Sequence, residues 1–334
     1  MDESFVSRAP SELSRGEPAA TPPLPSYYGQ PVIHKPHWNW LIIVYFFLGG
    51  IAGASAVIAA IADWVGPGDE RRAGRISRYV SFAALLPTPV LLILDLGRPE
   101  RFINMLRIVK LRSPMSTGTW GLTLFGIVSG CRMVRQVADD GLVGRGSVAR
   151  LAGLMPRRGA DLASVPLGFF VAGYTGILLA ATAIPLWAKR ALFLGPLFLA
   201  SAFSTATATI IAVMSLFPGG SLMAVSRLER LQAVAMVAEL ALHTAWTSRL
   251  GETAKPLTTG RTGRLLHHGT IGAGLVLPLC LHATKTVLPA RWSRPLRVIG
   301  SAFVLGGGFI LRYAVVVAGR DSADDPQATF DWAK

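Results

Sequence analysis

The stretch from Leu91 to Pro114 reads LLILDLGRPERFINMLRIVKLRSP, and the rest of the chain is organised around it. It begins inside an apolar helix, carries Asp95 to the end of that helix, and breaks at Gly97 and Pro99, which do not continue a helix well. The next residues have an apolar side made of Phe102, Ile103, Leu106 and Val109. Such a segment is typical of a short helix on a membrane surface, so it is either an amphipathic connector or a docking platform beside a buried acid. The pattern alone favours the connector.

The composition indicates a membrane protein. Of 334 residues, 51% are hydrophobic, and 33 basic residues against 19 acidic ones give a net charge of +14. The basic residues cluster between apolar runs, as expected for contacts with lipid headgroups, which argues against nucleic acid as a partner. They divide about evenly between the two predicted sides, so they do not set the orientation. The first 39 residues lack an apolar core, and we expect no cleavable signal peptide.

Eight apolar runs predict eight membrane-spanning helices. Each is long enough to cross a hydrocarbon core of about 30 Å at about 1.5 Å per residue. The runs are residues 40–62, 76–94, 119–137, 164–187, 191–216, 228–246, 267–288 and 296–319. We therefore expect an all-α integral membrane protein in which residues 40–319 form an eight-helix transmembrane domain. Residues 1–39 form an extramembrane tail and interface segment, residues 320–334 form a C-terminal tail, and the connector 132–163 is basic and exposed.

Six polar side chains are predicted to share the half of the membrane nearest the termini. They are Tyr45, Asp95, Tyr174, Glu239, His243 and Arg312. An ionisable group in hydrocarbon costs about 3 kcal/mol on insertion scales, so each needs a partner or a role. Together they suit a hydroquinone head, whose oxidation releases two protons and two electrons. Tyr45 and Tyr174 would bond the ring oxygens, while Asp95 and Glu239 would transfer protons.

Each of these residues also has a purely structural interpretation. The two tyrosines fit packing aromatics whose hydroxyl bonds a neighbour. Glu239 and Arg312 fit an ion pair between the sixth and eighth helices. Asp95 fits a pair with Arg98 or a cap where the helix breaks. The sequence leaves these alternatives open.

Metal and haem sites are not supported by the sequence. Cys131 and Cys280 stand alone, without the spacing of a zinc or iron–sulfur site. The six histidines do not offer two ligands that face each other from neighbouring helices, as a transmembrane haem requires. We expect neither haem nor metal in this protein.

Several runs resemble one known family. They are YYGQPVI at 27–33, YFFLGGIAGAS at 45–55, DLGRPERF at 95–102, GYTGILL at 173–179 and the closing segment 312–320. They resemble the NrfD family, the membrane subunits of polysulfide-reductase-like complexes. The resemblance implies an eight-helix subunit of a prokaryotic inner membrane that binds menaquinone or ubiquinone near one face. It also implies electron exchange with a four-cluster ferredoxin-like iron–sulfur subunit, which connects to a molybdopterin or other catalytic subunit.

The same resemblance implies roles for individual residues. Tyr174 matches a tyrosine that contacts the quinone, and Asp95 falls close to an acidic position proposed to begin a proton path. Tyr45 falls where the polysulfide-reductase subunit has a quinone-binding histidine, so a donor is kept while a group that titrates near neutral pH is lost. His37 and Asn39 lie near the same mouth and are further quinone-binding candidates.

Three functions remain open from the sequence. The first is a quinone-reactive subunit that is not catalytic alone. The second is a passive membrane anchor that holds the iron–sulfur and catalytic subunits on the connector 99–110. The third is a proton-translocating subunit, which requires a polar path through the opposite half of the membrane.

Overall fold

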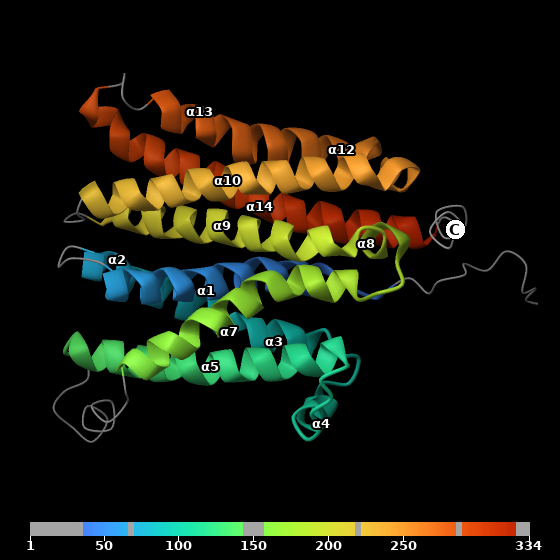
Figure 1. Ribbon diagram of the computed structural model, residues 1–334, viewed down its shortest axis with the longest axis horizontal. Helices are drawn as coiled ribbons and strands as arrows, with labels where there is room; N and C mark the ends of the chain where they lie inside the picture. The colour runs from blue at the N-terminus through green and yellow to red at the C-terminus, as the bar shows by residue number, and fades with distance from the viewer. Residues whose placement is uncertain (1–35, 66–69, 143–156, 218–221, 285–288, 325–334) are drawn as a thin grey trace, which may run out of the picture.

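Long helices run side by side along one axis of this computed structural model (Figure 1). The structure describes residues 36–65, 70–142, 157–217, 222–284 and 289–324, and these residues include no β-strand. The expectations for the tail 1–35, for the middle of the connector 132–163 and for the last ten residues lie outside the described residues.

The first half of the bundle is built around α1, which is almost entirely apolar. Four further long elements of this half pack on α1 or on one another. They are α2 and α3, which together form one rod, and α5 and α7. The bounds are α1 Trp40–Val65, α2 Glu70–Leu85, α3 Pro87–Leu94, α5 Pro114–Asp139 and α7 Arg157–Ala180. Pro87 has no N–H to donate, and it marks the turn between α2 and α3.

The second half consists of α9, α10, α14 and a composite rod. The bounds are α9 Leu194–Leu216, α10 Leu222–Leu250, α14 Ser293–Ala323, and for the rod α12 Gly260–Arg264, η4 Leu265–Val276 and α13 Leu277–Thr284. The η4 segment is a π-helix, which the sequence pattern did not predict. Short turns link the rods: α8 Pro185–Ala188, η2 Ala191–Phe193, η3 Gly251–Ala254, α11 Lys255–Thr258 and η5 Ala290–Trp292.

Close approaches between glycines hold α1 against α7. A Cβ on Gly53 would lie 2.5 Å from the carbonyl oxygen of Gly168, so neither position has room for a side chain. Small residues allow helix backbones to approach in this way inside membranes. The small-residue face of α1 therefore makes contacts between helices. The helix α1 also packs against α9 and α14, which joins the two halves.

Six helical rods are long and apolar enough to cross a membrane, by length and composition, within the described residues. They are α1, the α2–α3 rod, α7, η2 with α9, the α12–η4–α13 rod, and α14. The helices α5 and α10 have 26 and 29 residues but are more polar, and they are not among the six. The all-α membrane class is therefore confirmed, and the count of eight spans stays a prediction.

Several predicted boundaries were wrong by five residues or more, and one of these changes the position of a site residue in its helix. The fourth predicted helix, 164–187, ends at Ala180 and breaks before Pro185. Tyr174 consequently lies within two turns of the end of α7. The connector predicted from Arg132 is helical as far as Asp139, because α5 continues there.

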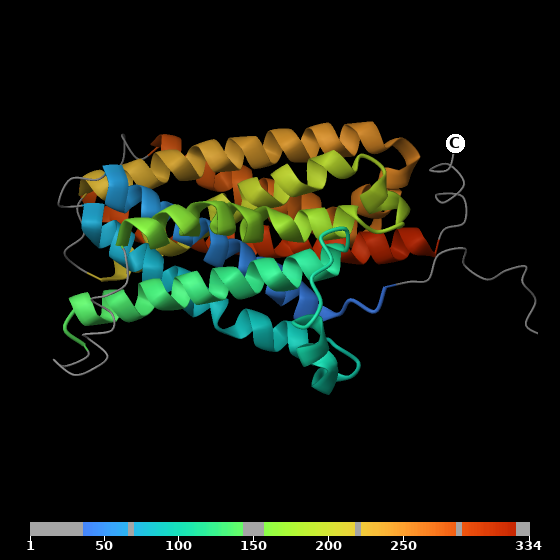
Figure 2. The same ribbon diagram turned by 60° about the horizontal axis from the view of Figure 1, so that its bottom comes forward.

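The two ends of the described bundle differ. The start of α1 and the end of α14 meet at one end, where the Nη1 of Arg320 donates to the carbonyl of Trp38 at 3.0 Å. We call this the terminal end. The short helices η1 Pro99–Arg101 and α4 Phe102–Met105 project from the bundle at the same end (Figure 2). The prediction of a short helix after the Gly97 break is confirmed, although the helix stops at Met105 and is followed by turns and extended backbone.

Candidate functional site

A cavity of about 200 Å³ lies at the terminal end of the first half of the bundle. Its walls come from α1, α3, α4, α5 and α7. Three of the polar residues singled out in the sequence line it together: Tyr45, Asp95 and Tyr174. The remaining lining residues are Trp38, Ile42, Leu92, Leu96, Gly97, Phe102, Met105, Met115, Gly118, Thr119 and Leu178. The cavity is thus mostly apolar, with a few convergent polar groups, as small-molecule sites usually are.

Both the hydroxyl group and the ring of Tyr174 are held in place by neighbouring residues. Its hydroxyl donates a hydrogen bond to the carbonyl of Pro114, at the first turn of α5. Its ring stacks on Phe170, one turn earlier on α7, with ring centroids 4.9 Å apart. With its proton directed at Pro114, the hydroxyl oxygen keeps lone pairs that can accept a hydrogen bond.

Gly118 provides the space that the Tyr174 ring occupies. A Cβ on Gly118 would overlap the ring and the hydroxyl oxygen of Tyr174, far inside van der Waals contact. No sequence pattern indicates this role, because a glycine in an apolar helix has no evident partner until the fold is known.

We expect Gly118→Ala to displace Tyr174 and to lower any activity of this cavity by roughly a hundredfold, since small misplacements at a site have such effects. Gly126→Ala is the matched control, because a Cβ on that α5 glycine would meet nothing within 4 Å. The activity of each variant relative to the wild type is the measurement. Equal turnover for the two variants would contradict this role of Gly118.

Tyr45 enters the cavity from α1 and is buried, with 4% of its surface exposed. Its neighbour in the cavity wall is Trp38, which precedes α1 and stacks on Trp187 with ring centroids 5.2 Å apart. Trp38 also meets Phe46 edge-on. Trp38 was not among the site residues predicted from the sequence, whereas the structure makes it a wall of the cavity.

Asp95 stands where α3 ends. Its backbone N–H donates to the Leu91 carbonyl at 3.1 Å, which continues the helix to this residue. Its Oδ1 is buried and has no hydrogen-bond partner among the described residues. Burial raises the pKa of Asp95 above the usual value for an aspartate. Among the described residues, Asp95 forms no ion pair with Arg98. Asp95 is therefore a carboxyl group with an open oxygen in the cavity wall.

The segment after Asp95 covers the mouth of the cavity. Phe102 and Met105 of α4 face inward and line it. Ile103, Val109 and Leu111 of the same segment are instead exposed, at 67%, 60% and 83%. The stretch from Leu91 to Pro114 thus closes the cavity with one side and presents apolar side chains on the other.

His37 and Asn39 are not among the lining residues that the structure describes for this cavity. Both are exposed. The Asn39 Oδ1 accepts a hydrogen bond from the Leu41 N–H at 2.8 Å, which caps the first turn of α1. Their predicted contact with a quinone remains a prediction.

Glu239 and Arg312 form a second buried cluster away from the cavity lining. Arg312 of α14 is fully buried and donates to the carbonyls of Phe46 at 3.2 Å and Gly308 at 2.8 Å, and to the Ser201 hydroxyl at 3.0 Å. Glu239 of α10 accepts from the Ser204 hydroxyl at 2.7 Å. The two serines lie on α9, one bonded to Arg312 and the other to Glu239, and no direct ion pair within 4.0 Å joins the two charged groups in the described structure. His243 lies one turn further along α10.

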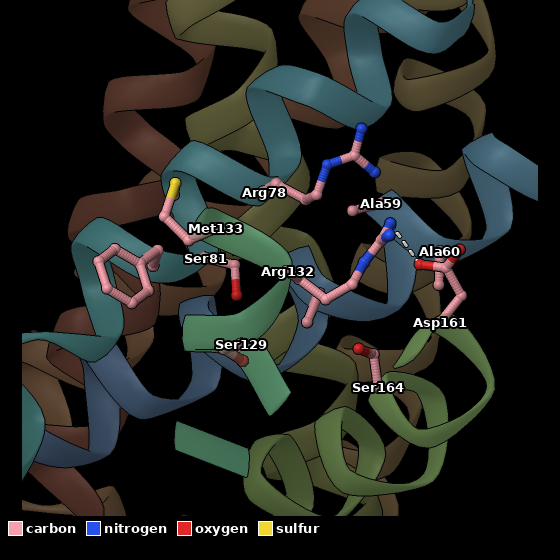
Figure 3. Close-up of a pocket in the computed structure, with 11 residues that line it drawn as sticks. Ala59, Ala60, Arg78, Ser81, Ser129, Arg132, Met133, Asp161 and Ser164 are labelled. Atoms are coloured by element: carbon pink, nitrogen blue, oxygen red, sulfur yellow. Dashed lines mark ion pairs between the residues drawn. The ribbon is translucent and has the colours of Figure 1, made fainter. Parts of the chain in front are cut away.

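A third polar cluster lies at the opposite end of the first half (Figure 3). Arg132 of α5 forms ion pairs with Asp161 of α7 and, at 2.9 Å, with Asp63 of α1. Arg78 of α2 pairs with the same Asp63 and donates to Gln136 at 2.7 Å. The side chains of Arg132 and Asp161 are only 11% and 6% exposed, so the prediction of an exposed connector was wrong for both. Their partners lie on helices distant in sequence, which the sequence pattern does not show.

An apolar band separates this third cluster from the cavity. On the buried face of α5, Thr119 lines the cavity and Ser129 borders the cluster. Between them stand Leu122 and Phe125, both buried. A proton-translocating function requires a polar path through the opposite half of the membrane, and the buried face of α5 does not supply one.

Metal ligands do not cluster in the residues that the structure describes. No group of three or more His, Cys, Asp or Glu side chains there could hold a metal ion.

Comparisons with known proteins identify the family of this protein. The family model described as "Polysulphide reductase, NrfD" matches residues 31–321. The C subunit of polysulfide reductase from Wolinella succinogenes is 29% identical over 308 residues, which cover 85% of this sequence and 94% of that protein. Together with the six apolar rods, these matches identify a multi-pass protein of the prokaryotic inner membrane, as predicted. The family model covers most of the sequence, so this protein belongs to the NrfD family, as its sequence motifs suggested.

Proposed function

We propose that this protein is the quinone-reactive membrane subunit of a respiratory oxidoreductase. It exchanges electrons between menaquinone or ubiquinone in the membrane and an iron–sulfur partner subunit. The observation that carries the proposal is the meeting of Tyr45, Asp95 and Tyr174, from three separate elements, around one apolar cavity. A quinone ring needs an apolar slot, hydrogen-bonding groups for its two oxygens and a proton carrier.

The residues of the cavity suit a quinol in particular. The Tyr174 hydroxyl already donates to Pro114, so its oxygen is available to accept from a quinol O–H. The open Oδ1 of Asp95 can accept a hydrogen bond from the other O–H, and the ionised carboxylate can take up one of the two protons. The Tyr45 hydroxyl supplies a further polar contact from α1. Since Glu239 lies outside the cavity lining, we assign proton transfer at the ring to Asp95, and the predicted role of Glu239 remains a prediction.

The partners and the membrane topology are part of the same proposal. The electrons pass to or from a four-cluster ferredoxin-like subunit, which is connected to a molybdopterin or other catalytic subunit. The relative from Wolinella succinogenes, one subunit of a polysulfide reductase, supports an assembly of several subunits. In this arrangement α5 and α10 also cross the bilayer, so residues 40–319 make eight spans as the quinone-binding domain between the tails 1–39 and 320–334.

Tyr174→Phe tests the site most simply. The variant keeps the ring stacked on Phe170 and removes only the hydroxyl, so we expect the complex to assemble and quinone-linked turnover to fall by about tenfold, the effect of one hydrogen bond. The matched control is Tyr313→Phe, a partly buried tyrosine of α14 outside the cavity lining. Turnover is measured with the native quinone. Unchanged turnover in Tyr174→Phe would reject this site.

A passive anchor is the second candidate, and the exposed apolar side chains of the segment after Asp95 favour it. These side chains are Ile103, Val109 and Leu111. An anchor should tolerate Tyr174→Phe and Asp95→Asn but should lose its partner subunits when this surface is charged.

We expect Val109→Asp to weaken retention of the partner subunits by roughly tenfold, because it places a charge on an apolar contact surface. Copurification of the partner subunits is the measurement. Glu100→Ala, at an exposed polar position of the same segment, is the control and should retain them. Full retention in Val109→Asp would exclude this surface as the point of attachment under either function.

A further inference from the structure

A long apolar groove runs along the outer face of the bundle, on the other side of α7 from the α5 contact. It consists of two hollows of about 680 Å³ and 630 Å³. Phe169, Pro196 and Leu199 line both hollows, so the two form one continuous groove. Its walls come from α7, α9 and α10, with α1 and α2 at one end.

The groove is lined by apolar side chains, several of them exposed. Val234 of α10 is 67% exposed and Ile61 of α1 is 46% exposed. Its floor is made of small residues, including Ala62, Ala200 and Ala235. These alanines, rather than any break in the helices, make the surface hollow. In a membrane protein such a face is in contact with lipid.

The two ionisable residues in the lining of the groove, Glu70 and Arg227, stand together at the end opposite the terminal end. One Nη of Arg227 pairs with Glu70, which is buried. The Arg227 side chain is nevertheless 52% exposed, and a guanidinium has five N–H donors. Arg227 can therefore bind a second anion while it remains paired with Glu70.

We propose that this groove binds an anionic phospholipid, with its acyl chains along the groove and its phosphate on Arg227. The charge at one end and the apolar surface along the rest match the two parts of such a lipid. A neutral isoprenoid tail would make no use of the arginine. A membrane-spanning helix about 10 Å wide and 30 Å long fills roughly 2,400 Å³, and the two hollows together hold only just over half of that volume.

The test uses the intact complex in nanodiscs made of equal parts of phosphatidylglycerol and phosphatidylcholine. The lipids that remain bound after transfer to detergent are identified by native mass spectrometry. Val234→Trp fills the groove, while Val237→Trp places the same side chain on the exposed surface of α10 outside the groove. Arg227→Gln removes the phosphate contact, and Arg230→Gln removes an exposed arginine of α10 that does not line the groove.

We expect wild type, Val237→Trp and Arg230→Gln to retain phosphatidylglycerol with a roughly fivefold preference over phosphatidylcholine. Val234→Trp should lose the retained lipid, and Arg227→Gln should keep lipid but lose the preference. Three results would overturn the proposal: equal retention in Val234→Trp and Val237→Trp, an unchanged preference in Arg227→Gln, or a polypeptide or quinone in the groove. Lipid retention is read without turnover, so this outcome is independent of the proposed function.

Discussion

Asp95→Asn should lower quinone-linked turnover by about a hundredfold while the complex still assembles, since a positioned proton carrier contributes at least that much. The substitution keeps the size of the side chain and removes only its ability to take up a proton. Its Oδ1 makes no hydrogen bond within the described structure, so little structural stability depends on the charge. Glu100→Gln, an exposed acid of the same segment, is the matched control and should leave turnover unchanged.

The pH dependence gives an independent check on Asp95. Burial raises the pKa of this carboxyl, so the group stays protonated to a higher pH than an ordinary aspartate. A carboxyl that accepts protons from quinol must be ionised, so turnover in that direction should rise as pH passes through the raised pKa. Turnover towards quinol needs the protonated form and should fall over the same range. Asp95→Asn should remove this dependence, and a variant that retained it would show that another group transfers the proton.

Arg312→Met should cost about 3–5 kcal/mol in the free energy of unfolding, because it leaves the buried Glu239 without a compensating charge. The variant also loses hydrogen bonds from α14 to the carbonyl of Phe46 on α1 and to Ser201 on α9. Unfolding in mixed micelles, followed by circular dichroism, measures the change. Arg294→Met, at an exposed position of the same helix, should have little effect.

The double variant Arg312→Met with Glu239→Gln separates charge compensation from packing. If the charge of Glu239 causes most of the loss, neutralising it should restore the larger part of the stability. A double variant as unstable as Arg312→Met alone would show that the lost hydrogen bonds and packing dominate. It would also contradict the interpretation of this cluster as a charge pair joined through serines.

The sequence singled out Tyr45, Asp95 and Tyr174 of the cavity because local chemistry marks them. Asp95 stands out as an acid at the end of an apolar run, and Gly97 and Pro99 force the backbone to turn beside it. Tyr45 and Tyr174 stand out as polar groups in apolar helices. The predicted end of the helix that carries Tyr174 was wrong, because the break before Pro185 looked like a kink rather than the end of α7.

Other features depend on contacts that a sequence does not show. Arg132 and Asp161 looked like connector residues, since nothing local reveals that Asp63 and Arg78 lie beside them. The separation of Glu239 from the cavity likewise depends on where α9 and α10 pack. The depth of the polar side chains in the membrane was predicted from helix length, whereas their position around the bundle is set by tertiary packing.

A structure of the assembled complex with its native quinone is the decisive measurement for the proposed site. We expect the quinone ring to lie in the cavity between α1, α3, α5 and α7, with its oxygens within hydrogen-bonding distance of Tyr174 and of Tyr45 or Asp95. A ring bound elsewhere, for example in the outer groove beside Phe169 or next to Glu239, with the cavity unoccupied, would contradict the assignment.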